Sequence, residues 1–314
     1  MLDFLEDRVG AEEPRDLGLS EDDLQQRLAA FNRRRLVPGL PGLHWRDEIN
    51  EDRDWLLLEG EFLERERRAV APRAAEAPTD PDGFDAWLTD LTATGPGQGD
   101  PLFPWLADTC SMPQMKWVLA QEVAGEAGFE DLTALTQVKM PAAPKLELAR
   151  NYWDEMGRGN EKGMHGPLLE TLARRLGLEP TTETTVWESL ALANTMAGLA
   201  WNRRYAYHAI GALGIIEQTA PSRAAAIGRG LKRLGVPSGD RHYFDLHAIL
   251  DIRHSEAWNA EAIRPLVAAN PNVAHAIAEG ALMRLACGAR TFERYRRELG
   301  WQADAKGRFV IPPQ

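Results

Sequence analysis

Apolar residues recur at helical spacing along most of the chain. In Trp55-Leu-Leu-Leu-Glu-Gly-Glu-Phe-Leu-Glu64 they follow a helical pattern, and four residues rich in arginine come next, where positive charge favours a helix carboxyl end. Further helices, separated by glycine and proline, are predicted at about 83–94, 103–126, 129–139, 144–158, 164–177, 182–200, 202–219, 221–234, 241–258, 259–269 and 271–300. Because no strand pattern of comparable length competes, we predict an all-α protein of long antiparallel helices, with a short hairpin near Arg308-Phe-Val-Ile311.

The pattern changes near residue 45. The first forty residues are charged and end in the turn-rich segment Val37-Pro-Gly-Leu-Pro-Gly-Leu43. We therefore predict an arm or linker over 1–44, a helical extension packed on the bundle over 45–100, and the main domain over 101–314.

Composition narrows the classes of function. The chain has 314 residues, 44% of them hydrophobic, and a formal net charge of -11, which argues against a nucleic-acid partner. Its two cysteines exclude a disulfide framework and any thiolate-rich metal site, so a metal would be held by nitrogen and oxygen. The first residues lack a signal-peptide pattern and no apolar stretch is long enough to span a bilayer, so we expect a cytoplasmic protein without a membrane partner.

One segment places three metal-ligating residue types on one side of a helix. His247, Asp251 and His254 are four and three residues apart, and at about 100° per residue their side chains fall within a sector of roughly 60°. Such a triplet also occurs on solvated faces. Because the rest of this helix is largely apolar, we expect the triplet to face the interior, where a metal would satisfy all three groups together.

Two other segments offer further ligands. Glu155 ends one amphipathic helix and His165 opens the next, with three glycines between them. An uninterrupted helix would point residues ten apart about 80° from each other, so the glycine-rich break can turn His165 toward Glu155. Glu217 follows an apolar run of small residues, where a lone carboxylate is costly unless it is paired or binds a cation. The alternatives are a plain surface loop and a helix end that reaches solvent.

Together these residues resemble a known family. The run Asn151-Tyr-Trp-Asp-Glu-Met-Gly-Arg-Gly159 leading to Met164-His165, a glutamate ending an apolar helix, and the His-Asp-His helix about thirty residues later resemble the haem-oxygenase-like di-iron oxidases and oxygenases over roughly 100–300. That family implies a bundle of about seven core helices with the iron site between three of them. The implied metal ligands are Glu155, His165, Glu217, His247, Asp251 and His254.

The spacing within the first ligand pair is similar to that of members that N-oxygenate amino groups. Such members can use an extra carboxylate from an earlier helix, for which Glu122 is the candidate, with Glu126 and Glu130 as reserves. The resemblance implies two Fe(II) ions as cofactors and O2 as co-substrate, although nitrogen and oxygen ligands also suit manganese.

For the substrate, we expect a small molecule, an amino acid or related amine that is oxygenated at nitrogen or cleaved at a C–C or C–N bond. Arginine pairs with carboxylates and aromatic rings line pockets, so the candidate substrate-binding residues are Arg158, Arg253, Tyr152 and Trp187. An external electron source and a homodimer are compatible with such a bundle, but no heptad seam specifies a dimer.

Three alternatives stay open on the residues alone. A haem-binding or haem-degrading protein of the same fold would need one axial histidine and would leave the acidic ligands unexplained. A cofactor-independent oxidase of this fold or a metal-free helical interaction protein would use none of them. A Soret band would identify haem, and Fe(II) binding that depends on His247 and Glu217 would exclude the metal-free protein.

Overall fold

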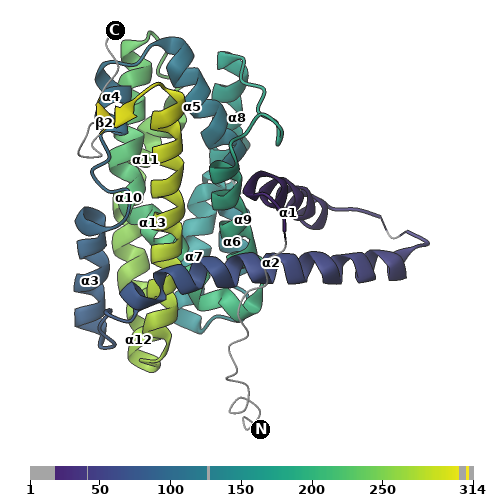
Figure 1. Cartoon of the computed structure of the whole chain (residues 1–314). Coiled ribbons are helices and arrows are strands. Elements are labelled where there is room, and N and C mark those ends of the chain that lie inside the picture. Colours follow the sequence, from purple (N-terminus) through teal and green to yellow (C-terminus); the bar gives the residue numbers. More distant parts are fainter. Residues whose placement is uncertain (1–17, 41, 126–127, 304–308, 311–314) are drawn as a thin grey trace, which may run out of the picture.

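The computed structural model describes residues 18–40, 42–125, 128–303 and 309–310, which form a helical bundle (Figure 1). Its α-helices are α1 (Glu21–Leu36), α2 (Trp45–Ala74), α3 (Pro81–Thr94), α4 (Leu102–Asp108), α5 (Met112–Gly125), α6 (Phe129–Thr136), α7 (Ala142–Glu155), α8 (His165–Leu176), α9 (Trp187–Trp201), α10 (Ala206–Arg233), α11 (His242–Ala257), α12 (Arg264–Ala269) and α13 (Val273–Glu298). Short 3-10 turns are η1 (Gly157–Gly159), η2 (Glu161–Gly163) and η3 (Arg203–Tyr205), and η4 (Trp258–Ile263) is a π-helix. The all-α prediction is confirmed.

At the centre of the bundle, α10 packs against α13 and α11. The close approach of α10 and α13 depends on two glycines, because a Cβ atom at Gly211 would collide with the carbonyl of Ile277, and one at Gly280 with the carbonyl of His208. The small residues of the apolar run before Glu217 therefore let two long helices meet with their backbones almost in contact.

The N-terminal region differs from the prediction of an arm or linker. Within 1–44, α1 is a helix capped by Ser20, whose hydroxyl accepts from the Asp23 N–H. It packs on α9, where Asn194 donates to Gln25 and accepts from Asn32. Only three of its apolar side chains, Leu24, Leu28 and Phe31, are buried, and in so charged a segment their periodicity was too weak to predict a helix. The carboxyl half of α2 crosses α13, whereas its amino half extends away from the bundle (Figure 1).

Two helix limits were also predicted wrongly. The segment 103–126 is divided into α4 and α5, because the Gln114 side chain accepts hydrogen bonds from the N–H and hydroxyl of Ser111 and starts a new helix. In contrast, α10 continues through Pro221, where a break was expected. Proline has no N–H, so the carbonyl of Glu217 loses its helical hydrogen bond, and packing against α4, α11 and α13 outweighs this cost.

The helix α11 turns its polar side inward. Asp251 and His254 are buried, whereas Ile249 and Ile252 are 70% and 51% exposed. The chain continues directly into η4 and α12, and the indole N–H of Trp258 donates to the carbonyl of Ile210 on α10 at 3.1 Å. This anchor and the π-helical turn hold α11 against α10 with its polar triplet facing the interior.

At the carboxyl end, the predicted hairpin appears as a two-residue antiparallel pair, β1 (Gln302–Ala303) with β2 (Phe309–Val310); Arg308 and Ile311 lie outside the described residues. Within the described part of the chain, no helix combines the length and apolar character needed to cross a membrane.

Candidate metal centre

Three parts of the bundle bring the predicted ligands together. The end of α7 and the start of α8 carry Glu155 and His165, α10 carries Glu217, and α11 carries the remaining three. Five of the six side chains are buried, and His247 is half-buried. Most of them line one cavity, so the helical spacing of the triplet and the two outlying segments converge on one site.

The chain reverses between α7 and α8 through η1 and η2. Gly157 and Gly159 adopt left-handed backbone angles, with φ of 60° and 83°, and a Cβ at Gly157 would collide with the backbone of Gly163. This tight turn brings His165 Nδ1 within 2.6 Å of Glu155 Oε2. The glycines thus serve the purpose expected from the sequence.

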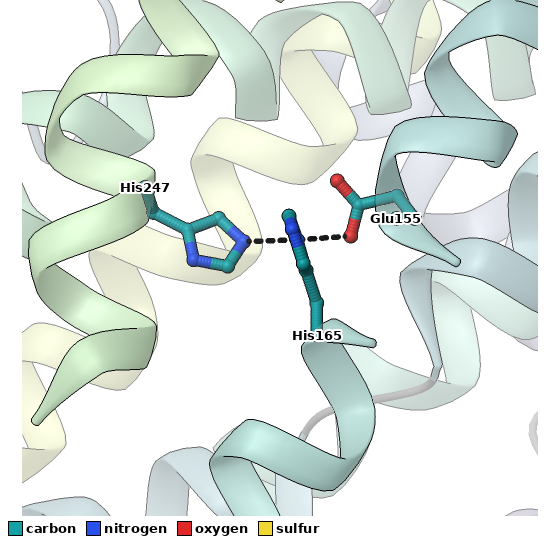
Figure 2. Close-up of side chains that lie close together, drawn as sticks. All are labelled: Glu155, His165 and His247. Atoms are coloured by element: carbon teal, nitrogen blue, oxygen red, sulfur yellow. Dashed lines mark hydrogen bonds and ion pairs between the residues drawn. The ribbon is translucent and has the colours of Figure 1, made fainter. Parts of the chain in front are cut away.

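The first group of donors consists of Glu155, His165 and His247 (Figure 2). His165 Nδ1 lies 3.1 Å from His247 Nε2 and 2.6 Å from Glu155 Oε2, so both neighbours face the same ring nitrogen. One ligand atom from each of the three side chains falls within 4.8 Å of the others. A single ion between them would replace these direct contacts by three coordination bonds.

A second group consists of Glu155, Glu217 and His254, again with one ligand atom from each within 4.8 Å of the others. His254 Nδ1 is 3.5 Å from Glu217 Oε1. Glu155 belongs to both groups, which is the position that a bridging carboxylate between two ions would occupy.

Hydrogen-bond acceptors behind two of the histidines orient their rings toward the site. The Nδ1 atom of His247 is 2.7 Å from the carbonyl oxygen of Tyr243, so it carries the proton and leaves the Nε2 lone pair facing the first group. His254 Nε2 is 3.2 Å from Asp154 Oδ2, which leaves Nδ1 for the second group. A carbonyl or carboxylate behind a histidine is the usual way in which proteins orient a metal ligand.

Burial and neighbouring charges shift the ionisation of the site. Burial lowers the pKa of His165 and His247 to about 4, with the charges of His254 and His165, respectively, adding to the effect. Both rings are therefore neutral at pH 7 and have a lone pair to give. For His254, burial opposes the charged form, but the Glu217 carboxylate outweighs it and raises the pKa to about 9, with Asp154 contributing.

The pKa values of two buried carboxyl groups at the site are raised. Burial raises the pKa of Asp251 to about 9, and the charges of Glu217 and Glu155 add to this. Burial, followed by the charge of Glu217, also raises the pKa of Glu155 well above its usual range. Three carboxyl groups and a protonated imidazole in one buried place form an arrangement that added cations would stabilise.

The donor set fits iron. Among the described residues, Asp251 Oδ1 is one of the buried atoms without a hydrogen-bond partner. Asp251 lines the same cavity but belongs to neither of the two donor groups, whereas His254 Nδ1 faces the Glu217 carboxylate. Buried polar atoms without partners are costly, and a metal ion would satisfy them. Three imidazoles and three carboxylates are ligands that suit a divalent first-row metal, as in carboxylate-bridged two-metal sites of helical bundles.

Two supporting residues were not singled out from the sequence. Asp154 holds His254 and in turn accepts from Arg158 Nε at 2.6 Å, and Asn151 Nδ2 donates to Glu217 Oε1 at 2.6 Å. Both lie on α7 within one turn of Glu155, and Asn151 is buried. The sequence had placed both residues in the predicted helix that ends at Glu155, but no role was assigned to them.

A cavity of about 200 Å³ extends from the ligands into the bundle. Its wall includes Glu155, Glu217 and Asp251 at one part and Phe103, Ile227 and Phe292 among its apolar residues. Together with its mixed polar and apolar wall, a cavity of this size suits a small molecule.

The candidate extra carboxylates occupy different parts of this cavity. Glu130 interacts electrostatically with His165 and Glu155, and burial raises its pKa. Gly166 provides the space for it, because a Cβ there would come within 2.9 Å of Glu130 Oε1. Glu122 instead interacts with Tyr295 and Arg223, and Glu126 lies outside the described residues.

The four candidate substrate-binding residues lie elsewhere. None of Arg158, Arg253, Tyr152 and Trp187 lines the cavity. The two arginines are exposed or pair at the surface, since they flank the ligands in sequence but point to the other side of their elements. The arginines on the cavity wall are Arg223 and Arg284.

The fold and the ligand set are those of a helical metal-binding protein, and the comparisons with known proteins agree. A model of the iron-containing redox enzyme family matches residues 116–289, which is more than half of the chain. The chain therefore belongs to the iron-containing redox enzyme family, and its haem-oxygenase-like fold is the one expected from the sequence.

Among solved structures, the chain is similar to a CADD-like protein of unknown function from Nostoc punctiforme, with 19% identity, a TM-score of 0.51, and coverage of 68% of this chain and 93% of that chain. A second structure of that protein gives 16% identity, a TM-score of 0.49, and coverage of 75% and 97%. At this identity the first likeness shows the fold alone. No curated protein matches the chain.

Proposed function

We propose that this protein is a non-haem di-iron, O2-dependent oxidase or oxygenase of a small amino acid or related amine. The observation that supports it most is the pair of three-residue ligand groups that share Glu155. One group would serve a single structural or catalytic ion, whereas two overlapping groups fit two ions joined by one carboxylate.

In this proposal, the six ligands would hold two ferrous ions, which would supply electrons and open coordination positions for O2 reduction. The chain contributes orientation and exclusion of water. The Tyr243 carbonyl and Asp154 keep the protons of His247 and His254 on the atoms that face away from the ions, and Asn151 directs one oxygen of Glu217. The apolar part of the cavity keeps water from the reacting groups.

For the extra carboxylate, we favour Glu130 over Glu122. The support is electrostatic contact of Glu130 with two of the ligands and the space that Gly166 leaves beside it. Glu122, which interacts with Tyr295, stays available for contact with substrate.

The amine assignment is supported by the carboxylates of the cavity wall. An ammonium group would find an ion-pair partner in Glu122, and the apolar lining would bind a short hydrocarbon chain. We expect continued turnover to need an external electron source.

The experiment is O2 uptake by protein loaded anaerobically with Fe(II) and mixed with single free amino acids, alkylamines or fatty acids. We expect substrate-dependent O2 uptake with an amine-containing compound, and its loss in His247→Ala but not in His242→Ala, an exposed histidine on the same helix. O2 uptake that is the same in both variants, or that appears only with fatty acids, contradicts the proposal in its metal or its substrate part, respectively.

A further inference from the structure

An arginine without a carboxylate partner lies beside the metal ligands. Arg223 is on α10, six residues after Glu217, and lines the same cavity. Its Nη2 donates to Thr219 Oγ1 at 3.0 Å, and its guanidinium carbon lies 5.8 Å from the centre of the Phe292 ring. Among the residues that the structure describes, no carboxylate forms an ion pair with Arg223, although Glu122 and Asp251 are near enough to interact with its charge.

A half-buried guanidinium without a carboxylate partner is costly in this position. Burial lowers the pKa of Arg223 to about 9, and the positive charge of Arg284, also on the cavity wall, lowers it further. The group is nevertheless charged at pH 7. Because the hydroxyl of Thr219 occupies only one of its five donor hydrogens and an aromatic ring supplies a weak interaction, the remaining donors are available for an anion.

The surroundings favour a carboxylate over a more highly charged anion. The Glu122 carboxylate acts on Arg223 and would repel a second negative charge on the ligand. A carboxylate carries one charge and has two oxygens in the plane that the guanidinium fork matches. The apolar neighbours Phe292 and Ile227 suit a ligand whose charged end is followed by hydrocarbon.

The position of Arg223 relative to the metal ligands sets the orientation of such a molecule in the cavity. Six residues of helix separate Arg223 from Glu217 by about 9 Å along the axis of α10. We propose that Arg223 binds the carboxylate of a small aliphatic acid or amino acid, whose other end lies at Glu217 and Asp251. This orientation rests on the proposed function, because it assumes that the reaction takes place at the metal ligands. Binding of the carboxylate by Arg223 does not depend on that function.

The test measures binding to the metal-free full-length protein by calorimetry, with hexanoate, 1-hexanol and inorganic phosphate as probes. We expect hexanoate to bind and 1-hexanol to bind at least tenfold more weakly, since it lacks the charge. Arg223→Gln should weaken hexanoate about 10- to 100-fold, and Arg223→Lys by less, whereas Arg229→Gln, an exposed arginine on the same helix, should leave it unchanged.

Thermal melting of each variant shows that it is folded, and Arg223→Lys keeps the test decisive if Arg223→Gln does not fold. Equal hexanoate affinity in the Arg223 and Arg229 variants overturns the inference, as does phosphate binding as tightly as hexanoate. Iron binding is measured separately: if the wild type binds no Fe(II) yet binds hexanoate through Arg223, the di-iron proposal fails while the carboxylate subsite stands. If the wild type binds Fe(II) but its affinity for hexanoate does not depend on Arg223, the carboxylate subsite is refuted while the di-iron proposal stands.

Discussion

Replacement of Asp154 by alanine is expected to weaken one iron site and leave the other intact. Asp154 Oδ2 lies 3.2 Å from His254 Nε2 and makes no part of the first ligand group. Loss of such a supporting partner typically reduces metal affinity about 10- to 100-fold, or about 1.4–2.7 kcal/mol. Because His254 belongs only to the second group, the change should appear in one of two dissociation constants.

The assay is anaerobic Fe(II) titration against a competing chelator, analysed for two sites. Arg158→Ala is the matched control, because Arg158 is exposed and braces Asp154 from outside. Exposed ion pairs are worth about 0–1 kcal/mol, so this variant should lose at most about fivefold in affinity. If Asp154→Ala is folded and both of its constants stay within about threefold of the wild type, the reasoning about His254 is refuted.

Three further results are expected. Gly280→Ala should cost about 1–3 kcal/mol in chemical denaturation because its Cβ would collide with α10, whereas Gly60→Ala, with open space in α2, should stabilise by up to about 1 kcal/mol; equal effects would contradict the close approach. Burial, with the charge of Glu66 adding, raises the pKa of Cys287 to about 11, so the thiols of the native protein should not react with a thiol reagent at pH 8, whereas unfolding should expose both. The free energy of unfolding should fall as pH rises from about 9 to 11, because in that range the Cys287 thiol ionises only in the unfolded chain. Arg223→Met should leave the metal-free protein at least as thermally stable as the wild type, because it removes a half-buried charge without a carboxylate partner, and a clear loss of stability would assign Arg223 a structural role.

The spacing of His247, Asp251 and His254 was sufficient to predict that they share one helix face, because helix geometry depends only on sequence separation. The outward isoleucines of α11 show the limit of this argument. Apolar residues around the triplet were taken as a sign of burial, yet Ile249 and Ile252 face outward while the polar residues are buried. Periodicity identifies which residues share a face of α11, but the packing of α11 against α10 decides which face is buried.

The supporting and substrate-facing residues were harder to predict because they depend on tertiary contacts. Asp154 meets His254 across a separation of 100 residues, which no local pattern encodes. Arg158 and Arg253 were chosen because arginine pairs with carboxylates, but neither lines the cavity, whereas Arg223, six residues after Glu217 on α10, does. Its only sequence signal was a charged residue among the small apolar residues that follow Pro221.

The most direct test of the central claim is the number of Fe(II) ions bound per chain in variants of the ligand groups, measured under anaerobic conditions. The overlap at Glu155 predicts two ions in the wild type and in Glu256→Ala, an exposed glutamate on α11, one in His247→Ala and in His254→Ala, and none held tightly in Glu155→Ala. A single ion in the wild type, or two ions retained in Glu155→Ala, would contradict a di-iron centre built on a shared carboxylate.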